Sequence, residues 1–335
     1  MIIQDSLPPL CRNPRRESTL STLRKSASSN WTVNDIPSQA GTLAVVTGTG
    51  GLGYETALAL AGAGAEVVIA GRSQAKGQDA VRRIVERHPR AAVRFKTLDL
   101  ASLDSVAEFS GCLTAEDRPI DLLVNNAGVM ATPRRHTTAD GFELQFGTNY
   151  LGHFALTARL LPLLRRSRVP RVVNLASLVH RWGVIDFDDL QGQHRYRPNA
   201  AYAQSKLAML MFALELQRRS DAAGWNLRSN AAHPGFARTE LIANGPGTDS
   251  FAVKLSLLLM PLMSHSAADG ALPTLFAATA ADATGAAYYG PRNRLELKGP
   301  PGTAVIGRQA RDVAVAARLW ERSGELTGAH WPSSK

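Results

Sequence analysis

The stretch Leu43-Ala-Val-Val-Thr-Gly-Thr-Gly-Gly-Leu-Gly53 decides the fold, because it joins a short apolar run directly to a glycine-rich turn. Residues 43–47 have the length and composition of a buried strand. Residues 52–63 then show the spacing of apolar side chains that is typical of a helix. The stretch therefore predicts a strand, a tight turn and a helix in direct succession.

The spacing Gly48-x-Gly50-x-x-Gly53 fits the fingerprint of a dinucleotide-binding turn, in the strand-to-helix context that the motif requires. Glycines at this turn let the backbone approach a pyrophosphate, whose charge then faces the free N–H groups at the helix N-terminus. We expect Gly48, Gly51, Leu52 and Gly53 to contact such a cofactor. An ordinary glycine-rich turn is the alternative interpretation.

The alternation of strand and helix continues along the chain. Strands are expected at residues 43–47, 66–70, 92–98, 120–124, 171–176, 226–231 and 287–289. Helices are expected at residues 52–63, 75–88, 102–114, 141–164, 200–220, 267–279 and 311–320. Continuous apolar strands that alternate with helices indicate a parallel sheet covered on both faces. The sequence thus predicts an α/β fold, a doubly wound parallel sheet of the Rossmann type, in one domain over residues 31–335.

The residue after the second expected strand bears on the choice of cofactor. An acidic residue about 20 positions beyond the glycines would bind the ribose 2′-hydroxyl of NAD. The sequence instead reads Ile69-Ala-Gly-Arg-Ser73, and Arg72 offers a planar fork of donors that suits a 2′-phosphate. We therefore expect NADP(H), with NAD as the less favoured cofactor, unless Arg72 is only a surface residue.

The composition narrows the class of protein. The chain has 335 residues, of which 44% are hydrophobic and 20% charged, as in ordinary soluble proteins. The net charge of +10 is spread over expected helix faces, and aromatic residues make up only 6%, so we expect no nucleic-acid partner. No apolar run reaches the roughly 18 to 20 residues that span a bilayer. The two cysteines, Cys11 and Cys112, form no disulfide framework, so we expect a reducing, cytoplasmic location, with Cys112 near the core.

Two segments stand apart from this pattern. Residues 1–30 are rich in Ser, Arg and Pro, and we expect a largely disordered extension. The apolar stretch Phe251–Met263 is interrupted by Lys254 and Pro261, and we expect it to form a lid over the substrate cavity. Packing onto the core, a contact in a homo-oligomer and a contact with a membrane surface are the alternatives for this stretch.

Seven motifs occur in the order found in one enzyme family. They are Asn125-Asn-Ala-Gly128, Thr148-Asn-Tyr-Leu-Gly-His-Phe154, Val172-Val-Asn-Leu-Ala-Ser177, Tyr202-Ala-Gln-Ser-Lys206, His233-Pro-Gly235, Tyr288-Tyr-Gly-Pro291 and Leu319-Trp-Glu-Arg-Ser-Gly-Glu-Leu-Thr-Gly328. From about Trp31 to Gly328 the chain thus resembles the short-chain dehydrogenase/reductase family, and within it the retinol-dehydrogenase-like branch. One departure concerns the glycine turn, where two residues separate Gly48 and Gly51 and the family has three. The shorter turn leaves open the roles of Thr49 and Gly50 in phosphate binding.

The resemblance implies four catalytic residues. Tyr202 and Lys206 are four positions apart, so they share one face of a helix. The nearby ammonium and the oxidised nicotinamide ring are together expected to bring the phenol pKa of about 10 closer to neutral pH. In the family, Tyr202 would exchange the proton, Ser177 would hydrogen-bond the substrate oxygen, and Asn149 would hold a water in a relay through Lys206. The residues alone also allow an exposed helix pair, a turn-forming serine and an asparagine that bonds only the backbone.

The resemblance also implies further contacts with the cofactor. Asp99 would contact the adenine amino group, although capping of the following helix is an alternative role for it. The remaining expected contacts are Leu100, Asn126, Ala127, Gly128, Tyr202, Lys206, Pro234, Gly235 and Thr239.

The expected activity is hydride transfer between a nicotinamide and the carbonyl or hydroxyl carbon of a small, hydrophobic ketone, aldehyde or alcohol. The alternatives are a non-catalytic NADP-binding sensor and an epimerase or dehydratase on the same fold. His153, His180, His194 and His233 lack the spacing of metal ligands, so we expect no metal.

Overall fold

The computed structural model describes residues 30–130, 132–236 and 265–332. Residues 1–29 of the expected N-terminal extension (residues 1–30), the apolar stretch Phe251–Met263 and the expected cofactor contact Thr239 lie outside the described residues. No helix within the described ranges is long and apolar enough to cross a membrane.

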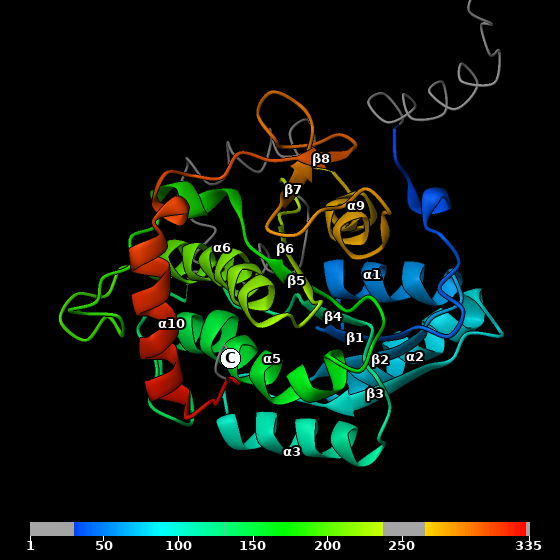
Figure 1. Ribbon diagram of the computed structural model, residues 1–335, viewed down its shortest axis with the longest axis horizontal. Helices are drawn as coiled ribbons and strands as arrows, with labels where there is room; N and C mark the ends of the chain where they lie inside the picture. Colours follow the sequence, from blue (N-terminus) through cyan, green and yellow to red (C-terminus); the bar gives the residue numbers. More distant parts are fainter. Residues whose placement is uncertain (1–29, 131, 237–264, 333–335) are drawn as a thin grey trace, which may run out of the picture.

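An eight-stranded sheet in the order β3-β2-β1-β4-β5-β6-β7-β8 forms the centre of the molecule (Figure 1). Neighbouring strands from β3 to β7 pair in parallel, and β8 pairs antiparallel with β7. The strands are β1 (Leu43–Thr47), β2 (Glu66–Gly71), β3 (Val93–Thr97), β4 (Leu122–Asn125), β5 (Arg171–Leu175), β6 (Arg228–Ala232), β7 (Tyr288–Pro291) and β8 (Pro301–Thr303). This arrangement is the doubly wound parallel sheet that the sequence predicts.

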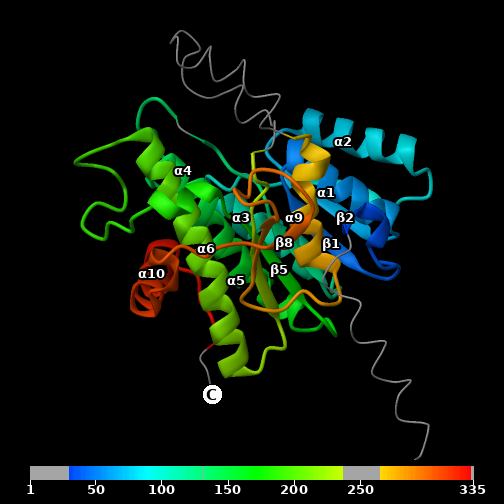
Figure 2. The ribbon, with the colours of Figure 1, turned by 90° about the horizontal axis from the view of Figure 1, so that it is seen from above.

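Helices cover both faces of the sheet, and the two groups separate clearly in the view from above (Figure 2). One face packs against α1 (Gly51–Gly62), α2 (Gln74–Arg87) and α9 (Ala267–Thr279). The other face packs against α3 (Leu103–Ala115), α5 (Gly152–Leu164) and α6 (Pro198–Ala223), with α10 (Val313–Thr327) outside α5 and α6. Short helical turns complete the described chain at Val33–Asp35 (η1), Leu144–Phe146 (α4), Gly147–Leu151 (η2), Leu178–Trp182 (η3) and Gln309–Arg311 (η4).

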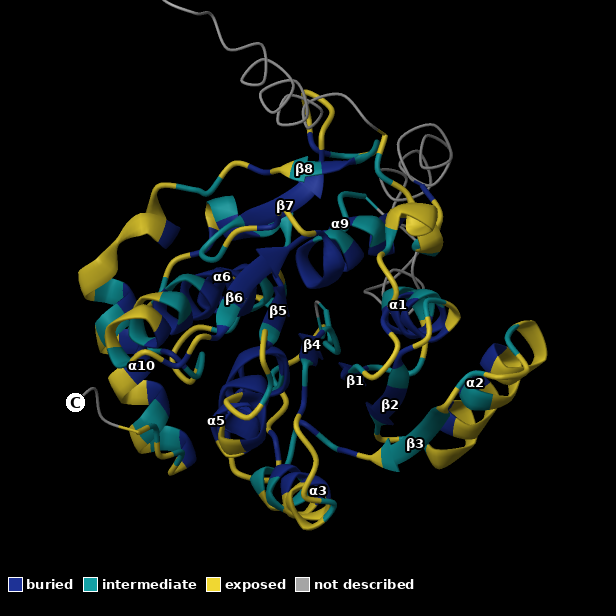
Figure 3. Cartoon of the chain, turned by 45° about the vertical axis from the view of Figure 1, so that its right-hand side comes forward, coloured by how far each residue is buried: buried dark blue, intermediate teal, exposed yellow. Residues whose placement is uncertain are grey.

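The central strands are buried on both sides, which explains their continuous apolar sequence. In β1, Leu43 and Val45 join the core on the α5–α6 face, whereas Ala44 and Val46 join the core on the α1–α9 face. Alternate side chains of a strand point to opposite faces, so a strand between two helical layers must be apolar at every position. The outer helices show the complementary pattern in Figure 3, where α2 and α10 expose their outward faces.

The expected helix at residues 141–164 is divided into three parts. After α4 the chain makes one wider π-helical turn, η2, before α5 begins at Gly152. Such π-turns commonly occur at functional sites. This one contains Asn149, an expected catalytic residue.

Three other features of the structure differ from what the sequence predicts. The last helix extends to Thr327 and ends at Gly328, whose left-handed φ of 60° terminates it, rather than ending at residue 320. Strand β8 was not expected, because three residues that begin with Pro and Gly carry no strand signal. Cys112 is exposed on α3 and does not lie near the core.

The order of the strands positions the site. From β1 the chain forms β2 and β3 on one side, and it then crosses to β4 on the other side of β1. Ligands of such sheets bind at the carboxyl ends of the strands beside this switch point. The turns that follow β1, β2, β4, β5 and β6 carry most of the expected site residues, and they meet at this edge.

Candidate active site

Helix α6 carries Tyr202 and Lys206 on one face and passes beside the end of β5. It begins with Pro198 in its first turn, where proline is favoured because no N–H bond is lost. Lys206 is 5% exposed, and its Nζ donates a hydrogen bond of 2.9 Å to the carbonyl oxygen of Leu175, the last residue of β5. The same Nζ lies 5.8 Å from the centroid of the Tyr202 ring.

Ser177 lies two positions beyond Leu175, and its side chain lies close enough to the Tyr202 phenol to favour the phenolate form. Its hydroxyl also accepts the N–H of Val179 at 3.4 Å and so caps η3. Serine, tyrosine and lysine thus converge at the carboxyl end of β5. Ser177 thus caps a turn, which is the alternative role that the sequence allows, and it also lies near Tyr202.

The electrostatics of the pair differ from the sequence-based expectation. Burial raises the pKa of Tyr202 to about 12, although the hydrogen bond from Ser177 acts in the opposite direction. Burial lowers the pKa of Lys206 to about 8. Desolvation disfavours both the phenolate and the ammonium, and so opposes the expected approach of the phenol pKa to neutral pH. The phenol is therefore protonated at neutral pH.

Asn149 joins the loop after β4 to helix α6. Its Oδ1 accepts the N–H of Val129 at 2.7 Å, and its Nδ2 donates to the carbonyl of Val129 and to Ser205 Oγ, each at 2.9 Å. A side chain on Gly128 would meet Asn149 Oδ1 at 2.9 Å and lie 3.7 Å from Lys206 Nζ. Close packing therefore requires glycine at position 128, beside two of the expected catalytic residues.

Thr47, the last residue of β1, links the glycine turn to the loop after β4. Its Oγ1 accepts the N–H groups of Asn126 and Ala127, each at 2.9 Å, and lies 2.9 Å from His153 Nε2 on α5. On its other side, His153 Nδ1 lies 2.8 Å from the carbonyl oxygen of Asn149. One hydroxyl and one imidazole thus connect three elements of the site.

The partners of His153 define its protonation. A carbonyl oxygen can only accept, so Nδ1 carries the proton that is donated to Asn149. Burial lowers the pKa of His153 to about 4, so the ring is neutral and its Nε2 accepts the hydroxyl proton of Thr47. His153 therefore fixes the backbone of the π-turn in which Asn149 lies.

The N-terminus of α1 is left open by the protein. Gly50 is its N-cap residue, no side chain caps it, and its first turn contains no acidic residue. By contrast, the N-termini of α2, α3, α9 and α10 are capped by Ser73, Ser102, Ser266 and Asp312. Uncapped N–H groups and the helix dipole suit an anionic group, so the donor set fits the pyrophosphate of a dinucleotide.

The shortened glycine turn is closely packed. The side-chain amide of Asn126 donates to the carbonyl of Thr47 at 2.7 Å. A Cβ on Gly48 would lie 2.7 Å from this amide, and a Cβ on Gly53 would lie 2.6 Å from it. Gly48 also has a φ of 101°, which disfavours other residues. Thr49 places its methyl group against Gly71, next to Arg72. Thr49 thus fills the space beside the end of β2.

The other residues that are expected to contact the cofactor lie in the segments that follow the strands. Arg72 directly follows β2, is exposed, and forms no ion pair with any residue that the structure describes. Asp99 accepts the N–H of Ala101 at 3.0 Å, as the first residue of an Asx turn does, and Ser102 instead of Asp99 caps α3. Leu100 is buried, and its carbonyl lies against Gly152 at the start of α5. Of the expected contacts after β6, Pro234 and Gly235 are described.

No site role was expected from the sequence for four residues whose side chains link the loops around the site, namely Thr47, His153, Ser205 and Glu296. His153 lies one turn beyond Asn149 in the quoted motif, so the spacing offered a signal for it. No group of three or more potential metal ligands occurs within the described ranges.

Replacing Thr47 tests whether its hydroxyl holds this network together. We expect Thr47→Val to lower the free energy of unfolding by about 2 to 3 kcal/mol, because two largely buried N–H groups lose their acceptor. Urea denaturation at neutral pH measures the effect. Thr49→Val is the matched control in the same turn, since the Thr49 hydroxyl makes no hydrogen bond with any described residue. Equal midpoints for the two variants would contradict the assignment.

Comparison with known proteins assigns the family. The family model described as short chain dehydrogenase matches residues 42–247. The chain is 44% identical over 299 residues to mouse (Mus musculus) polyprenol dehydrogenase, covering 88% of this chain and 86% of the relative. It is 42% identical over 306 residues to human (Homo sapiens) retinol dehydrogenase 13, covering 89% and 88%. A crystal structure of an uncharacterized protein from Mycobacterium paratuberculosis superposes with a TM-score of 0.76 at 40% identity, covering 91% of this chain and all of that one. The chain belongs to the short-chain dehydrogenase/reductase family, in its retinol-dehydrogenase-like branch, and is an NAD(P)-dependent oxidoreductase.

Proposed function

We propose that this protein is an NADP(H)-dependent oxidoreductase that interconverts a hydrophobic ketone or aldehyde and the corresponding alcohol, with Tyr202 as the group that exchanges the proton. The observation that carries the proposal is the convergence of the Ser177 side chain, the Tyr202 phenol and buried Lys206 at the end of β5. These three groups lie at the edge of the sheet where doubly wound folds bind their ligands.

Each side chain supplies a separate part of the proton chemistry. The nicotinamide supplies or accepts the hydride when it is bound, and the protein aligns the reactants and handles the proton. Tyr202 is protonated at neutral pH, so it is ready to donate to the substrate oxygen during reduction. Ser177 hydrogen-bonds the same oxygen, and the Lys206 ammonium stabilises the phenolate that remains.

Asn149 acts by holding this arrangement. Both polar atoms of its side chain bond to Val129 or Ser205, and its carbonyl accepts the bond from His153. These contacts fix the loop after β4, including Gly128, against Lys206. We therefore assign Asn149 a positioning role through its side chain.

The preference for NADP(H) rests on Arg72. The residue follows β2, where the adenosine ribose of a dinucleotide lies in doubly wound folds. Its guanidinium is exposed, and no described carboxylate neutralises it. An unpaired guanidinium favours a 2′-phosphate over a 2′-hydroxyl, because it can form two parallel charge-assisted hydrogen bonds with the phosphate.

Two observations support a hydrophobic substrate. The relatives described above are named for polyprenol and retinol, both of which are long apolar alcohols. In this chain, Trp182 and Val184 follow Ser177 closely and are 74% and 67% exposed. Exposed apolar side chains in the segment that follows Ser177 suit the approach of an apolar molecule.

Removing the phenol hydroxyl tests the proposed reaction. We expect the wild-type protein to oxidise NADPH in the presence of medium- and long-chain aldehydes or ketones. Tyr202→Phe should lower kcat/KM by at least about 100-fold, because the proton donor is lost while the ring remains. NADPH absorbance at neutral pH measures turnover, and NADPH fluorescence measures binding. Cofactor binding without turnover across the panel in the wild type would contradict the proposed function.

Reversing the charge at position 72 tests the choice of cofactor. We expect Arg72→Asp to change the ratio of kcat/KM for NADPH to that for NADH by about 100-fold in favour of NADH. The variant loses the charge-assisted bonds to the 2′-phosphate and gains an acceptor for a 2′-hydroxyl. Arg292→Asp, which changes charge equally at another exposed arginine, is the control. An unchanged ratio in Arg72→Asp would refute the assignment of NADP(H).

A further inference from the structure

A buried carboxylate, Glu296, lies between the two loops that border the site. It belongs to the segment that joins β7 to β8, and it is 8% exposed. Its φ of 55° lies in the left-handed region, which a residue with a side chain adopts at a cost in free energy. Such backbone conformations persist where the surrounding contacts enforce them, often at functional sites.

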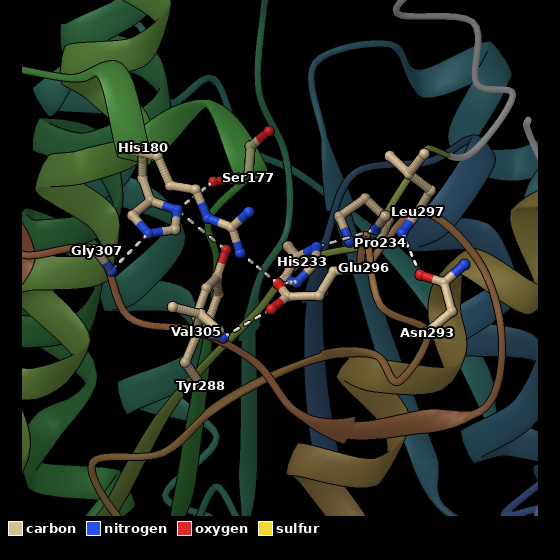
Figure 4. Close-up of polar contacts among 12 residues, drawn as sticks. Ser177, His180, His233, Pro234, Tyr288, Asn293, Glu296, Leu297, Val305 and Gly307 are labelled. Atoms are coloured by element: carbon tan, nitrogen blue, oxygen red, sulfur yellow. Dashed lines mark hydrogen bonds and ion pairs between the residues drawn. The ribbon is translucent and has the colours of Figure 1, made fainter.

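The Glu296 carboxylate accepts bonds from three directions. Its Oε2 accepts from Arg181 Nη2 at 2.8 Å and lies 3.2 Å from His233 Nε2, and its Oε1 accepts the N–H of Val305 at 3.0 Å. Figure 4 shows the carboxylate between Ser177 and His180 on one side and Pro234 and Leu297 on the other. One charged group thus holds together segments that are far apart in the sequence.

On the side of the cofactor loop, the partners define the form of His233. Its Nδ1 accepts the N–H of Gly235 at 3.2 Å, so the proton lies on Nε2 and is donated to Glu296. The ring lies against Gly290 of β7, where a Cβ would lie 1.9 Å from Nε2. Glu296 therefore fixes the orientation in which His233 supports the Pro234–Gly235 turn.

The backbone beside Glu296 packs directly on the same turn. The carbonyl of Leu297 accepts the N–H of Phe236 at 2.8 Å. A Cβ on Gly235 would lie 2.3 Å from that carbonyl oxygen, and Gly235 has a φ of 67°. The conformation of the turn therefore depends on where the segment around Glu296 lies.

On the side of the catalytic serine, Arg181 belongs to η3, the helical turn that Ser177 caps. His180 of the same turn is held at both ends, since Nδ1 lies 2.7 Å from the Ser177 carbonyl and Nε2 accepts the N–H of Gly307 at 3.1 Å. The ion pair with Arg181 thus attaches Glu296 to the segment that carries the Ser177 hydroxyl.

We propose that Glu296 is a positioning residue that sets the Pro234–Gly235 turn relative to Ser177, and so aligns the cofactor with the substrate oxygen. The inference rests on the proposed function, in which Pro234 and Gly235 contact the cofactor and Ser177 contacts the substrate. Small displacements between reacting groups lower rates strongly, so a clamp between these loops affects binding and turnover, and not only stability.

Glu296→Gln tests this proposal because it keeps the shape of the side chain and removes its charge. The side-chain amide of glutamine has one oxygen that accepts and one NH2 group that donates. The NH2 group would therefore face either the N–H of Val305 or the donors of Arg181 and His233, where the carboxylate offers an acceptor. We expect the Kd for NADPH to rise by about tenfold and kcat for carbonyl reduction to fall by about tenfold or more. Fluorescence titration gives the Kd, and kcat is expressed per NADPH-binding site, so that unfolded protein does not contribute.

Glu215→Gln is the matched control. Glu215 on α6 is also a buried carboxylate that pairs with two arginines, Arg218 and Arg219, but it has no contact with the site. Its loss should lower the Tm without changing the Kd for NADPH or kcat per site. Equal kinetic effects in the two variants, or none in Glu296→Gln, would overturn the proposal.

Arg181→Gln removes the link from Glu296 to the Ser177 segment and keeps its link to His233. It also tests the proposal if Glu296→Gln does not fold. This variant leaves the bond between Glu296 and His233 in place, so the Kd for NADPH should stay within about twofold of the wild type while kcat falls. A kcat equal to that of the wild type would contradict the proposal.

If the wild type binds neither NADPH nor NADH, the proposed function fails, and this inference fails with it. If the wild type turns over substrate and Glu296→Gln matches Glu215→Gln, only the inference fails.

Discussion

The hydrogen bond from the Lys206 ammonium to the Leu175 carbonyl is the constraint on which the site depends. It ties α6 to the end of β5, two positions before Ser177, and so brings the Tyr202 phenol to the serine hydroxyl. No described carboxylate pairs with this ammonium, and its charge is deprived of water. A buried, unpaired cation is costly. Under the proposed function it stabilises the phenolate that forms when Tyr202 gives up its proton.

The parallel sheet brings the other elements to this point. Because the strands run in one direction, the ends of β1, β4, β5 and β6 meet at one edge, and their turns must be held at fixed distances from one another. Three polar links do this: the Thr47 hydroxyl with neutral His153, the Asn149 side chain with Val129 and Ser205, and the Glu296 carboxylate. Each link is buried or nearly so, and buried polar groups rigidify a structure when all of their partners are present.

Much of this organisation could be predicted from the sequence, because it arises from local patterns. The apolar strands, the glycine turn and the spacing of Tyr202 and Lys206 each carry a signal within a few residues. The π-turn at Asn149 and the extension of α10 to Thr327 were missed, since tertiary packing and a left-handed glycine determine them. Expected residues such as Thr239 lie outside the described ranges, so their roles stay predictions.

Two features could not be predicted from local patterns. Glu296 and Arg181 are 115 residues apart, and Glu296 lies in an irregular segment without periodicity, so only the folded chain reveals their pairing. The pKa of Tyr202 depends on how completely the protein removes water from the phenol. Sequence spacing indicates that Lys206 is near but does not indicate desolvation, which raises the pKa of the phenol.

The state of the Lys206 ammonium tests the central claim most directly. An NMR titration of the protein with ¹³C-labelled lysine, with the signal assigned by its loss in Lys206→Met, follows the charge of this group alone. The structure predicts a midpoint near pH 8, because burial lowers the pKa of Lys206 to about 8 from its ordinary 10.5. A midpoint near pH 10.5 would show a hydrated ammonium away from the phenol and would contradict the account.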